Sequence, residues 1–590
     1  MTSRPLHASP RVACLLLCFL WRPSPVTFAS PDAPPHNARM IREFETPNLL
    51  QRRVYGTAGI TALVGLYLLV GLIGHDPWRG DDAVHFGPVL SMLKGEGWLF
   101  PMLAGEPLVD YPPLYYWTGT LLAWASSGFL ALHEGARLAS AVFVALGVYF
   151  AARTAEALYG RPARTPAALL MMGGLGLVLH AHEIQPLLAL MAMIALTLRG
   201  LAQVPQQPLA GSLLAGLGSA LAFLAAGLGG LLLTATLFPL LMLLSRDCRS
   251  PRASGALLLG LCLALTLSAL WPLAVHLLQP ELFSLWLREE WSRLSGPLLS
   301  TTEMVHGLEL LGWFTWPLWP IVLWSVWRAR RRLGDLRWLL PLLSAVLIIS
   351  VLVIQGQLSQ ASALPILPAM ALLAAAGVPS LRRGAANALD WFSLMSLAVF
   401  GILVWLAWSA QSAGWPPGLA RHVARNAPDF VLPDPFFQAL FGAAISAVWI
   451  ALLWKLPRSS SRAPANWAIG LTMLWCLAVV LLMPWFDHGR SYRGAARSLE
   501  IALAGERSST PGACIASTGL PEHVKSSLDY FAGIRTVRIV GDSTPCPLLL
   551  VMNERRSKDQ LAPEWKPVWE FRRGAGRRTE TFTLLRRELP

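Results

Sequence analysis

Long runs of apolar residues, separated by short polar stretches, dominate this chain. A helix needs roughly 20 apolar residues to cross a bilayer. Thirteen runs approach that length, at 55–73, 136–158, 165–181, 186–200, 209–226, 228–245, 254–277, 309–327, 338–355, 361–378, 389–410, 437–455 and 466–485. The pattern therefore predicts an α-helical polytopic membrane protein with about 13 transmembrane helices.

Two further stretches, 82–94 and 114–132, are predicted to be helices that lie along the outer membrane surface. Pro112 and Pro113 precede the second stretch, and polar residues such as Thr118 interrupt it. If 114–132 crossed the bilayer, the later basic loops would fall on the outer side, against the positive-inside rule.

The basic residues between the runs give the orientation. Arg52 and Arg53 precede the first run and place the N-terminus in the cytoplasm. Each basic cluster between runs then falls on the cytoplasmic side: Arg161 and Arg164; Arg199; Arg246, Arg249 and Arg252; Arg328, Arg330, Arg331, Arg332 and Arg337; Arg382 and Arg383; Lys455, Arg458 and Arg462. The loops 74–135, 180–185 and 278–308 and the C-terminal tail are therefore predicted to lie outside.

The two ends of the chain differ from this pattern. Residues 1–39 form an extension outside the fold, and 40–486 form the membrane domain. The apolar run at 12–21 is too short to span a bilayer and resembles a signal peptide. The alternative is a translation start at Met40, which the loop charges favour because signal cleavage would invert every later span.

Residues 487–590 are polar and predict a small extracytoplasmic α/β domain. The expected strands are 513–517, 534–540, 547–552 and 581–585, and the expected helix is 522–530. If this region is extracytoplasmic, Cys514 and Cys546 can form a disulfide. Cys248, Cys262 and Cys476 lie in or beside apolar runs, as small apolar residues do. No G-x-G-x-x-G motif and no P-loop occurs in the tail, so no nucleotide site is predicted there.

The composition supports a membrane protein and argues against nucleic-acid binding. The chain has 590 residues, of which 54% are hydrophobic and 14% are charged. Its net charge of +14 could suggest a nucleic-acid partner. The basic residues instead cluster in short loops between apolar runs, which is the arrangement that membrane orientation requires.

The ionisable candidates for chemistry gather on the outer side. Asp81 and Asp82 follow the first run, where a charge near hydrocarbon is costly and therefore indicates function. The alternative is that both cap the helix that starts there. The other candidates are His85, Asp110, His180, His182, Glu183, Glu289, Glu290 and His306.

Carboxylates at this surface suit two kinds of chemistry. A carboxylate can take the proton of an attacking hydroxyl or amine, and a pair can hold a divalent metal ion through oxygen ligands. The i,i+2 spacing of His180 and His182 does not put both rings on one helix face, which favours a solvated turn over a metal site. For Glu289 and Glu290, the alternative to a functional role is that they belong to an ordinary run of solvent-exposed charged residues.

Several spaced motifs carry a family resemblance. After the acidic dyad come Gly-Trp-Leu-Phe-Pro at 97–101, Asp-Tyr-Pro-Pro-Leu-Tyr-Tyr-Trp at 110–117, Gly-Ala-Arg-Leu at 135–138 and Ala-Leu-Pro-Ile-Leu-Pro at 363–368. Over about residues 50–380, the chain resembles the ArnT-like and protein-O-mannosyltransferase group of GT-C membrane glycosyltransferases.

The resemblance implies a polyprenyl-phosphate-linked sugar as donor, an outer-face site, and an acceptor such as lipid A, a glycan or a protein. Asp81 matches the catalytic acidic residue and Asp82 its partner. Asp110 matches a substrate-binding or metal-binding carboxylate, and Arg137 matches an arginine that would neutralise the lipid phosphate. His85, Tyr111 and Glu183 complete the expected substrate-binding set. The expected location is a bacterial inner membrane with a periplasmic site.

The chain also departs from the family pattern. Tyr111 stands where a lysine is usual, and Gln185 stands where an aspartate is common, with Glu183 as a substitute two residues earlier. Phe-Leu-Ala-Ala-Gly at 223–227 stands where a lysine usually precedes the glycine. These departures leave open an alternative function, a catalytically inactive protein that binds or transports lipid-linked sugars.

Overall fold

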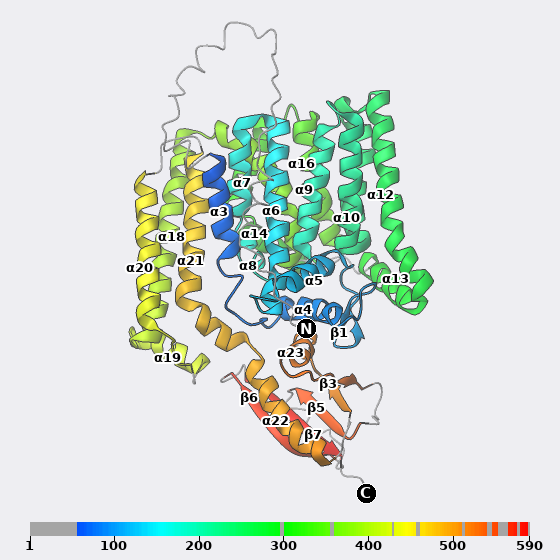
Figure 1. Cartoon of the computed structure of the whole chain (residues 1–590). Helices are drawn as coiled ribbons and strands as arrows, with labels where there is room; N and C mark the ends of the chain where they lie inside the picture. Colours follow the sequence, from blue (N-terminus) through cyan, green and yellow to red (C-terminus); the bar gives the residue numbers. More distant parts are fainter. Residues whose placement is uncertain are drawn as a thin grey trace, which may run out of the picture.

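A bundle of long helices with a small β-sheet domain at one end makes up the protein (Figure 1). The computed structural model describes residues 56–295, 300–354, 359–427, 430–455, 461–509, 514–539, 546–552, 565–574 and 579–587. The predicted N-terminal extension, Met40, Arg52 and Arg53 lie outside these residues.

The predicted fold class is confirmed. Among the described residues, eight helical stretches are long and apolar enough to cross a membrane: Leu132–Tyr159, Pro208–Leu244, Pro251–Leu278, Leu336–Ile354, Ala361–Ser380, Arg383–Ser412, Pro435–Lys455 and Arg462–Glu506. Two shorter apolar helices are Ala58–Leu69 and Leu187–Gln203. The count of thirteen spans is not confirmed by length and composition.

One of the eight stretches contains two of the predicted runs. Helix α10 (Pro208–Ala235) has non-helical backbone angles at Ala226 and Gly227, and α11 (Leu237–Leu244) continues it. Gly260 of α12 (Pro251–Leu278) lies against both Ser212 and Phe238, which flank this break. The chain therefore turns back at residues 226–227, and the runs 209–226 and 228–245 lie beside the same helix.

Two other predicted spans are broken helices. The run 165–181 forms α7 (Arg164–Met172) and α8 (Leu175–His180), and the run 309–327 lies in α14 (Thr301–Phe314) and α15 (Leu318–Ala329). The remaining predicted runs correspond to α3 (Thr57–Leu69), α6 (Leu132–Tyr159), α9 (Leu187–Gln203), α16 (Leu336–Ile354), α17 (Leu367–Gly377), α18 (Arg383–Ser412), α20 (Pro435–Lys455) and α21 (Arg462–Arg490).

Short helices cover one end of the bundle. α4 (Asp81–Leu93) and α5 (Leu114–Ser126) lie across the ends of the long helices on the side of the sheet domain, as predicted for 82–94 and 114–132 (Figure 1). α13 (Pro280–Leu294) and α19 (Pro417–Asn426) lie at the same end. This end of the bundle therefore carries an irregular layer in which polar side chains can meet.

The C-terminal region is an α/β domain, as predicted. Its five-stranded sheet has the order β4-β3-β5-β7-β6, with β3, β4 and β5 parallel and β6 and β7 antiparallel. The strands are β3 (Ile515–Thr518), β4 (Val537–Arg538), β5 (Leu548–Met552), β6 (Trp565–Arg573) and β7 (Glu580–Arg587). The helices are α22 (Arg493–Ser509) and α23 (Glu522–Ala532), and a disulfide joins Cys514 to Cys546. The sequence pattern did not predict β6 or α22.

The sheet domain packs through α23 onto the segment between α3 and α6. Lys94 at the end of α4 pairs with Asp529 at 2.8 Å, and Lys525 pairs with Glu106 at 2.9 Å. On the same side, Arg493 pairs with Asp76, and the Asp487 carboxylate accepts a hydrogen bond from the Asp76 backbone N–H at 2.8 Å. These contacts hold the loop between the bundle and the sheet.

Candidate active site

The acidic dyad opens helix α4, and its two side chains have different surroundings. Gly80 precedes the helix with φ of 110°, a backbone conformation that glycine adopts without strain. Successive side chains of a helix point about 100° apart, because the helix has 3.6 residues per turn. Asp81 is exposed, whereas Asp82 is 1% exposed. The dyad is therefore one accessible and one buried carboxylate.

Asp82 joins three segments of the chain. Its Oδ2 accepts hydrogen bonds from the Trp78 N–H at 2.9 Å and from Arg137 Nη2 at 2.7 Å. Its Oδ1 accepts from Arg137 Nε at 3.2 Å and from the Ile184 N–H at 2.9 Å. Burial raises the pKa of this carboxyl, but the Arg137 charge and these donors outweigh burial and lower it to about 2. Asp82 therefore stays ionised. It does not cap the helix as the alternative interpretation expected, since Gly80 is the N-cap residue and no side chain accepts a capping hydrogen bond there.

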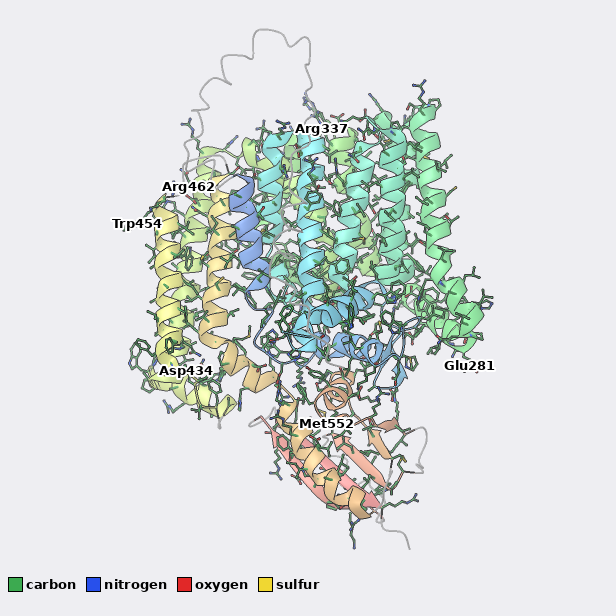
Figure 2. All side chains as sticks on the ribbon, viewed as in Figure 1. Glu281, Arg337, Asp434, Trp454, Arg462 and Met552 are labelled. Carbon is green, nitrogen blue, oxygen red and sulfur yellow. A yellow bond between two sulfur atoms is a disulfide. The ribbon has the colours of Figure 1, made fainter. Side chains whose placement is uncertain are left out.

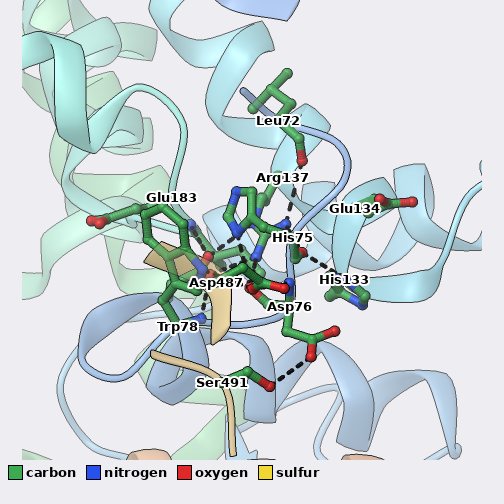
Figure 3. Close-up of polar contacts among 12 residues, drawn as sticks. Leu72, His75, Asp76, Trp78, His133, Glu134, Arg137, Glu183, Asp487 and Ser491 are labelled. Carbon is green, nitrogen blue, oxygen red and sulfur yellow. Dashed lines mark hydrogen bonds and ion pairs between the residues drawn. The ribbon is translucent and has the colours of Figure 1, made fainter. Parts of the chain in front are cut away.

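Arg137 is fully buried, and its donors are fully used (Figure 3). Nη1 donates to the carbonyls of Leu72 at 3.3 Å and His75 at 2.9 Å, and Nη2 donates to the Asp76 carbonyl at 2.7 Å. With the two bonds to Asp82, all five N–H groups of the guanidinium have acceptors. The sequence-based expectation that Arg137 contacts the lipid phosphate does not fit this geometry, since no N–H is left to donate to a ligand.

Asp81 is held by a residue from the loop before α9. The Gln185 side-chain amide donates to Asp81 Oδ2 at 2.9 Å, and its own oxygen accepts from the Leu187 N–H at 3.3 Å. Gln185 is 1% exposed, so its amide is fixed. Gln185 rather than Glu183 therefore contacts the accessible carboxylate.

His85 lies one turn after Asp81 along α4 and is buried. Its Nδ1 hydrogen-bonds the Tyr116 hydroxyl at 3.0 Å, and its ring meets the Tyr111 ring edge-on with centroids 5.4 Å apart. Burial lowers the pKa of His85, and the negative charges of Asp81 and Asp110 oppose that shift. His85 and Tyr111 thus lie in the field of both Asp81 and Asp110.

Asp110 meets a cation that the sequence reasoning missed. Arg293 of α13 donates from Nη2 to Asp110 Oδ1 at 3.2 Å and from Nη1 to the Asp110 carbonyl at 2.9 Å. Arg293 Nη1 also lies 3.2 Å from Glu290 Oε1. The i,i+3 spacing of Glu290 and Arg293, which favours a helical ion pair, was the available signal.

A cavity opens beside this ion pair. Its polar lining includes Asp110, Glu290, Arg293 and Ser362, and Arg293 is the one cationic residue among the described residues that line it. The opposite lining is apolar and comes from several helices: Leu187, Leu190, Leu233, Ile348, Val351 and Leu352. A charged end and an apolar wall suit a ligand with a phosphate and a hydrocarbon tail.

The helix break at Gly227 forms part of this site. Gly227 has φ 61° and ψ −146°, a region that is open essentially to glycine alone. A side chain there would approach the Glu290 carboxylate, whose Oε2 accepts from the Leu228 N–H at 3.0 Å. Burial raises the pKa of Glu290, and Arg293 and the Leu228 N–H oppose that shift.

Gly227→Ala is expected to destabilise the protein by about 1–2 kcal/mol and to displace Glu290. Thermal unfolding with and without added polyprenyl phosphate measures both effects, because a displaced Glu290 reduces the stabilisation by ligand. Gly255→Ala on α12 is the matched control, since a Cβ there meets no atom within 4 Å. Equal unfolding temperatures and equal ligand stabilisation in the two variants would contradict this role of Gly227.

The other candidate residues that the sequence suggested lie apart from Asp81 and Arg293. His182 is buried, stacks on Trp475, and has both ring nitrogens 2.6 Å from the carbonyls of Tyr67 and Val178. Glu183 pairs with His180 at 3.5 Å, and His306 pairs with Glu309 on the surface. Glu289 does not line the cavity, although Glu290 does.

The predicted metal at Asp110 does not fit the residues around it. No group of three or more His, Cys, Asp or Glu residues that could hold a metal ion occurs in the described part of the chain. The Asp110 carboxylate and carbonyl already accept hydrogen bonds from Arg293.

Comparison with known proteins agrees with the resemblance. No protein-family model matches the chain. It is 29% identical over 218 residues to the undecaprenyl phosphate-alpha-4-amino-4-deoxy-L-arabinose arabinosyl transferases of Pseudomonas aeruginosa (strain UCBPP-PA14) and Pseudomonas paraeruginosa (strain DSM 24068 / PA7). That match spans 36% of this chain and 39% of each relative's length.

The structural likeness covers much more of the chain. ArnT from Cupriavidus metallidurans, in the crystal structure bound to undecaprenyl phosphate, superposes with a TM-score of 0.64 over 89% of this chain and 97% of that chain, at 16% identity. The apo structure gives a TM-score of 0.61 at 18% identity. The predicted resemblance is confirmed, and this multi-pass membrane protein has the fold of ArnT.

Proposed function

We propose that this protein is a membrane glycosyltransferase that moves a sugar from a polyprenyl-phosphate donor to an acceptor outside the cytoplasm. The observation that carries the proposal is an accessible carboxylate, Asp81, on a buried ionic frame, together with a cavity that combines Arg293 with an apolar wall. Tyr111, which lines this cavity, lies in the electric field of both Asp81 and Asp110. The names of the arabinosyl transferase relatives and the undecaprenyl phosphate bound to ArnT support the same donor class.

The reaction follows from these positions. Asp81 accepts the proton of an acceptor hydroxyl or amine as that group attacks the anomeric carbon of the donor sugar. The bond between that carbon and the phosphate oxygen breaks, and the polyprenyl phosphate leaves with the electron pair. Arg293 faces the cavity and compensates the charge that develops on the leaving phosphate.

The remaining residues of the site position Asp81 and Arg293. Asp82 and Arg137 fix the start of α4 and hence the direction of Asp81. Gln185 orients the Asp81 carboxylate, and His85 packs against Tyr111 in the field of both Asp81 and Asp110. In this assignment, Arg137 is a positioning residue, and Arg293 takes the phosphate-binding role that the resemblance gave to Arg137.

The proposed orientation puts the site in the periplasm of a bacterium and the protein in the inner membrane. Arg337 and Arg462 lie at the end of the bundle opposite the sheet domain, and Glu281 and Asp434 lie at the end nearer to it (Figure 2). Excess basic residues mark the cytoplasmic end of membrane helices. The Cys514–Cys546 disulfide suits an oxidising compartment around the sheet domain.

The proposed domain division is an N-terminal extension at residues 1–39, a membrane domain with the site at residues 40–486, and a periplasmic domain at residues 487–590. The acceptor, which is lipid A, a glycan or a protein, approaches Asp81 from this side.

Transfer of radiolabel tests the proposal. Purified protein, in detergent or nanodiscs, is given a panel of labelled polyprenyl-phosphate sugars and an extract of bacterial membranes. Label is expected to pass from the donor into an acceptor fraction. Movement of intact donor across a proteoliposome membrane without sugar transfer would instead favour the alternative, an inactive protein that binds or transports lipid-linked sugars.

Gln185→Glu is expected to move the acidic limb of the pH–rate profile to higher pH, by about one pH unit or more. The reason is that a second carboxylate beside Asp81 favours proton binding there, where the wild-type amide donates a hydrogen bond. Initial rates measured across the pH range check this shift. An acidic limb at the wild-type position would show that Gln185 does not act on the titrating group.

A further inference from the structure

Four oxygen atoms surround the terminal nitrogens of Arg293. Nη1 lies 2.9 Å from the Asp110 carbonyl and 3.2 Å from Glu290 Oε1. Nη2 lies 3.2 Å from both the Val109 carbonyl and Asp110 Oδ1. Two carboxylates and two carbonyls are the oxygen ligands that hard divalent cations prefer. These four oxygen atoms therefore form a site for a cation, and the Arg293 guanidinium occupies that site.

The contacts around this position leave no room for a second cation. Glu290 is buried, and its other oxygen accepts from the Leu228 N–H. A divalent ion among the same four oxygens would lie within a few ångströms of the guanidinium, where like charges repel strongly in a medium of low dielectric constant.

The guanidinium also suits the chemistry of the cavity. Its four Nη N–H groups donate to Val109, Asp110 and Glu290, so it offers a phosphate in the cavity its fixed positive charge rather than free Nη donors. It lines the cavity from α13, and its side chain is 20% exposed, so the cavity can reach it.

We propose that Arg293 is a built-in replacement for a divalent metal ion, so that sugar transfer by this chain needs no metal. This proposal rests on the proposed function, because it assigns the cation that faces the donor phosphate. It predicts that the four oxygens become a metal site once the guanidinium is removed.

The test compares wild type, Arg293→Ala and Arg293→Gln with Arg288→Ala, a matched control in which an exposed arginine of the same helix is removed. Each protein is stripped with EDTA and assayed for transfer without metal. Wild type and Arg288→Ala are expected to keep full turnover. Both Arg293 variants are expected to lose about 10²- to 10³-fold, the loss typical when a charge-stabilising donor is removed. Loss of wild-type turnover in EDTA with recovery on adding Mg²⁺ or Mn²⁺ would overturn the proposal.

A binding measurement that does not depend on turnover accompanies the assay. Calorimetric titration with Mn²⁺ is expected to show a site in the Arg293 variants that wild type and Arg288→Ala lack. Equal Mn²⁺ binding in wild type and in both Arg293 variants would overturn the proposal. If wild type transfers no sugar from any donor, the proposed function fails, and the titration still decides whether Arg293 fills a cation site.

Discussion

Asp81→Asn is expected to reduce kcat for sugar transfer by about 10²- to 10⁴-fold, the contribution typical of a general base. The amide keeps the size of the side chain but cannot take the acceptor's proton. Because Asp81 is exposed and its one described hydrogen bond is to Gln185, the variant is expected to unfold at the wild-type temperature. Rates at saturating donor and a thermal unfolding curve measure the two quantities.

The control for Asp81→Asn is Asp434→Asn, which removes an exposed carboxylate from the same end of the molecule (Figure 2). Its turnover is expected to equal that of wild type. Wild-type turnover in Asp81→Asn would show that another group takes the proton, and the assignment of Asp81 would then be wrong.

Asp82→Asn is expected to act on stability instead. It leaves the fully buried Arg137 guanidinium without its charge partner, which typically costs about 3–5 kcal/mol. Asp335→Asn, which breaks the exposed pair with Arg337, is expected to change stability by at most about 1 kcal/mol. Chemical or thermal unfolding in detergent measures both, and equal losses in the two variants would contradict the structural role of Asp82.

Asp82 is also expected to make the stability of the protein depend on pH. The pKa of Asp82 is lowered from an ordinary value of 3.8 to about 2. A carboxyl with a lowered folded-state pKa stabilises the protein above its unfolded pKa, and that contribution is lost as pH falls towards the folded value. The Asp82–Arg137 pair is therefore at full strength at neutral pH, and it weakens only between about pH 4 and pH 2.

The helical architecture and the layer of short helices that holds the candidate site could be predicted from the sequence because their signals are local. Each apolar run satisfies its own backbone hydrogen bonds as a helix, so length and apolarity suffice to identify it. The acidic pair after the first run and the Pro-Pro motif at 112–113 likewise mark the layer of short helices. The C-terminal sheet was predicted in outline for the same reason, since most of its strands are short apolar runs.

The assignment of individual residues could not be predicted because it depends on distant contacts. Sequence spacing gives no sign that Arg137 meets Asp82, 55 positions earlier, or that Arg293 meets Asp110, 183 positions earlier. The fold-back at Gly227 also depends on packing against α12. β6 was missed because its exposed and half-buried residues, from Trp565 to Arg573, lack a clear apolar alternation.

The most direct test of the central claim is the stoichiometry of a single reaction. Wild type is incubated with a labelled polyprenyl-phosphate sugar and membrane extract, and both the sugar-bearing acceptor and the free polyprenyl phosphate are quantified by mass spectrometry. We expect one polyprenyl phosphate released for each sugar transferred by wild type, and about 10²- to 10⁴-fold slower formation of both products by Asp81→Asn. Acceptor that stays unmodified with every donor, while wild type and Asp81→Asn bind the donor equally, would contradict it.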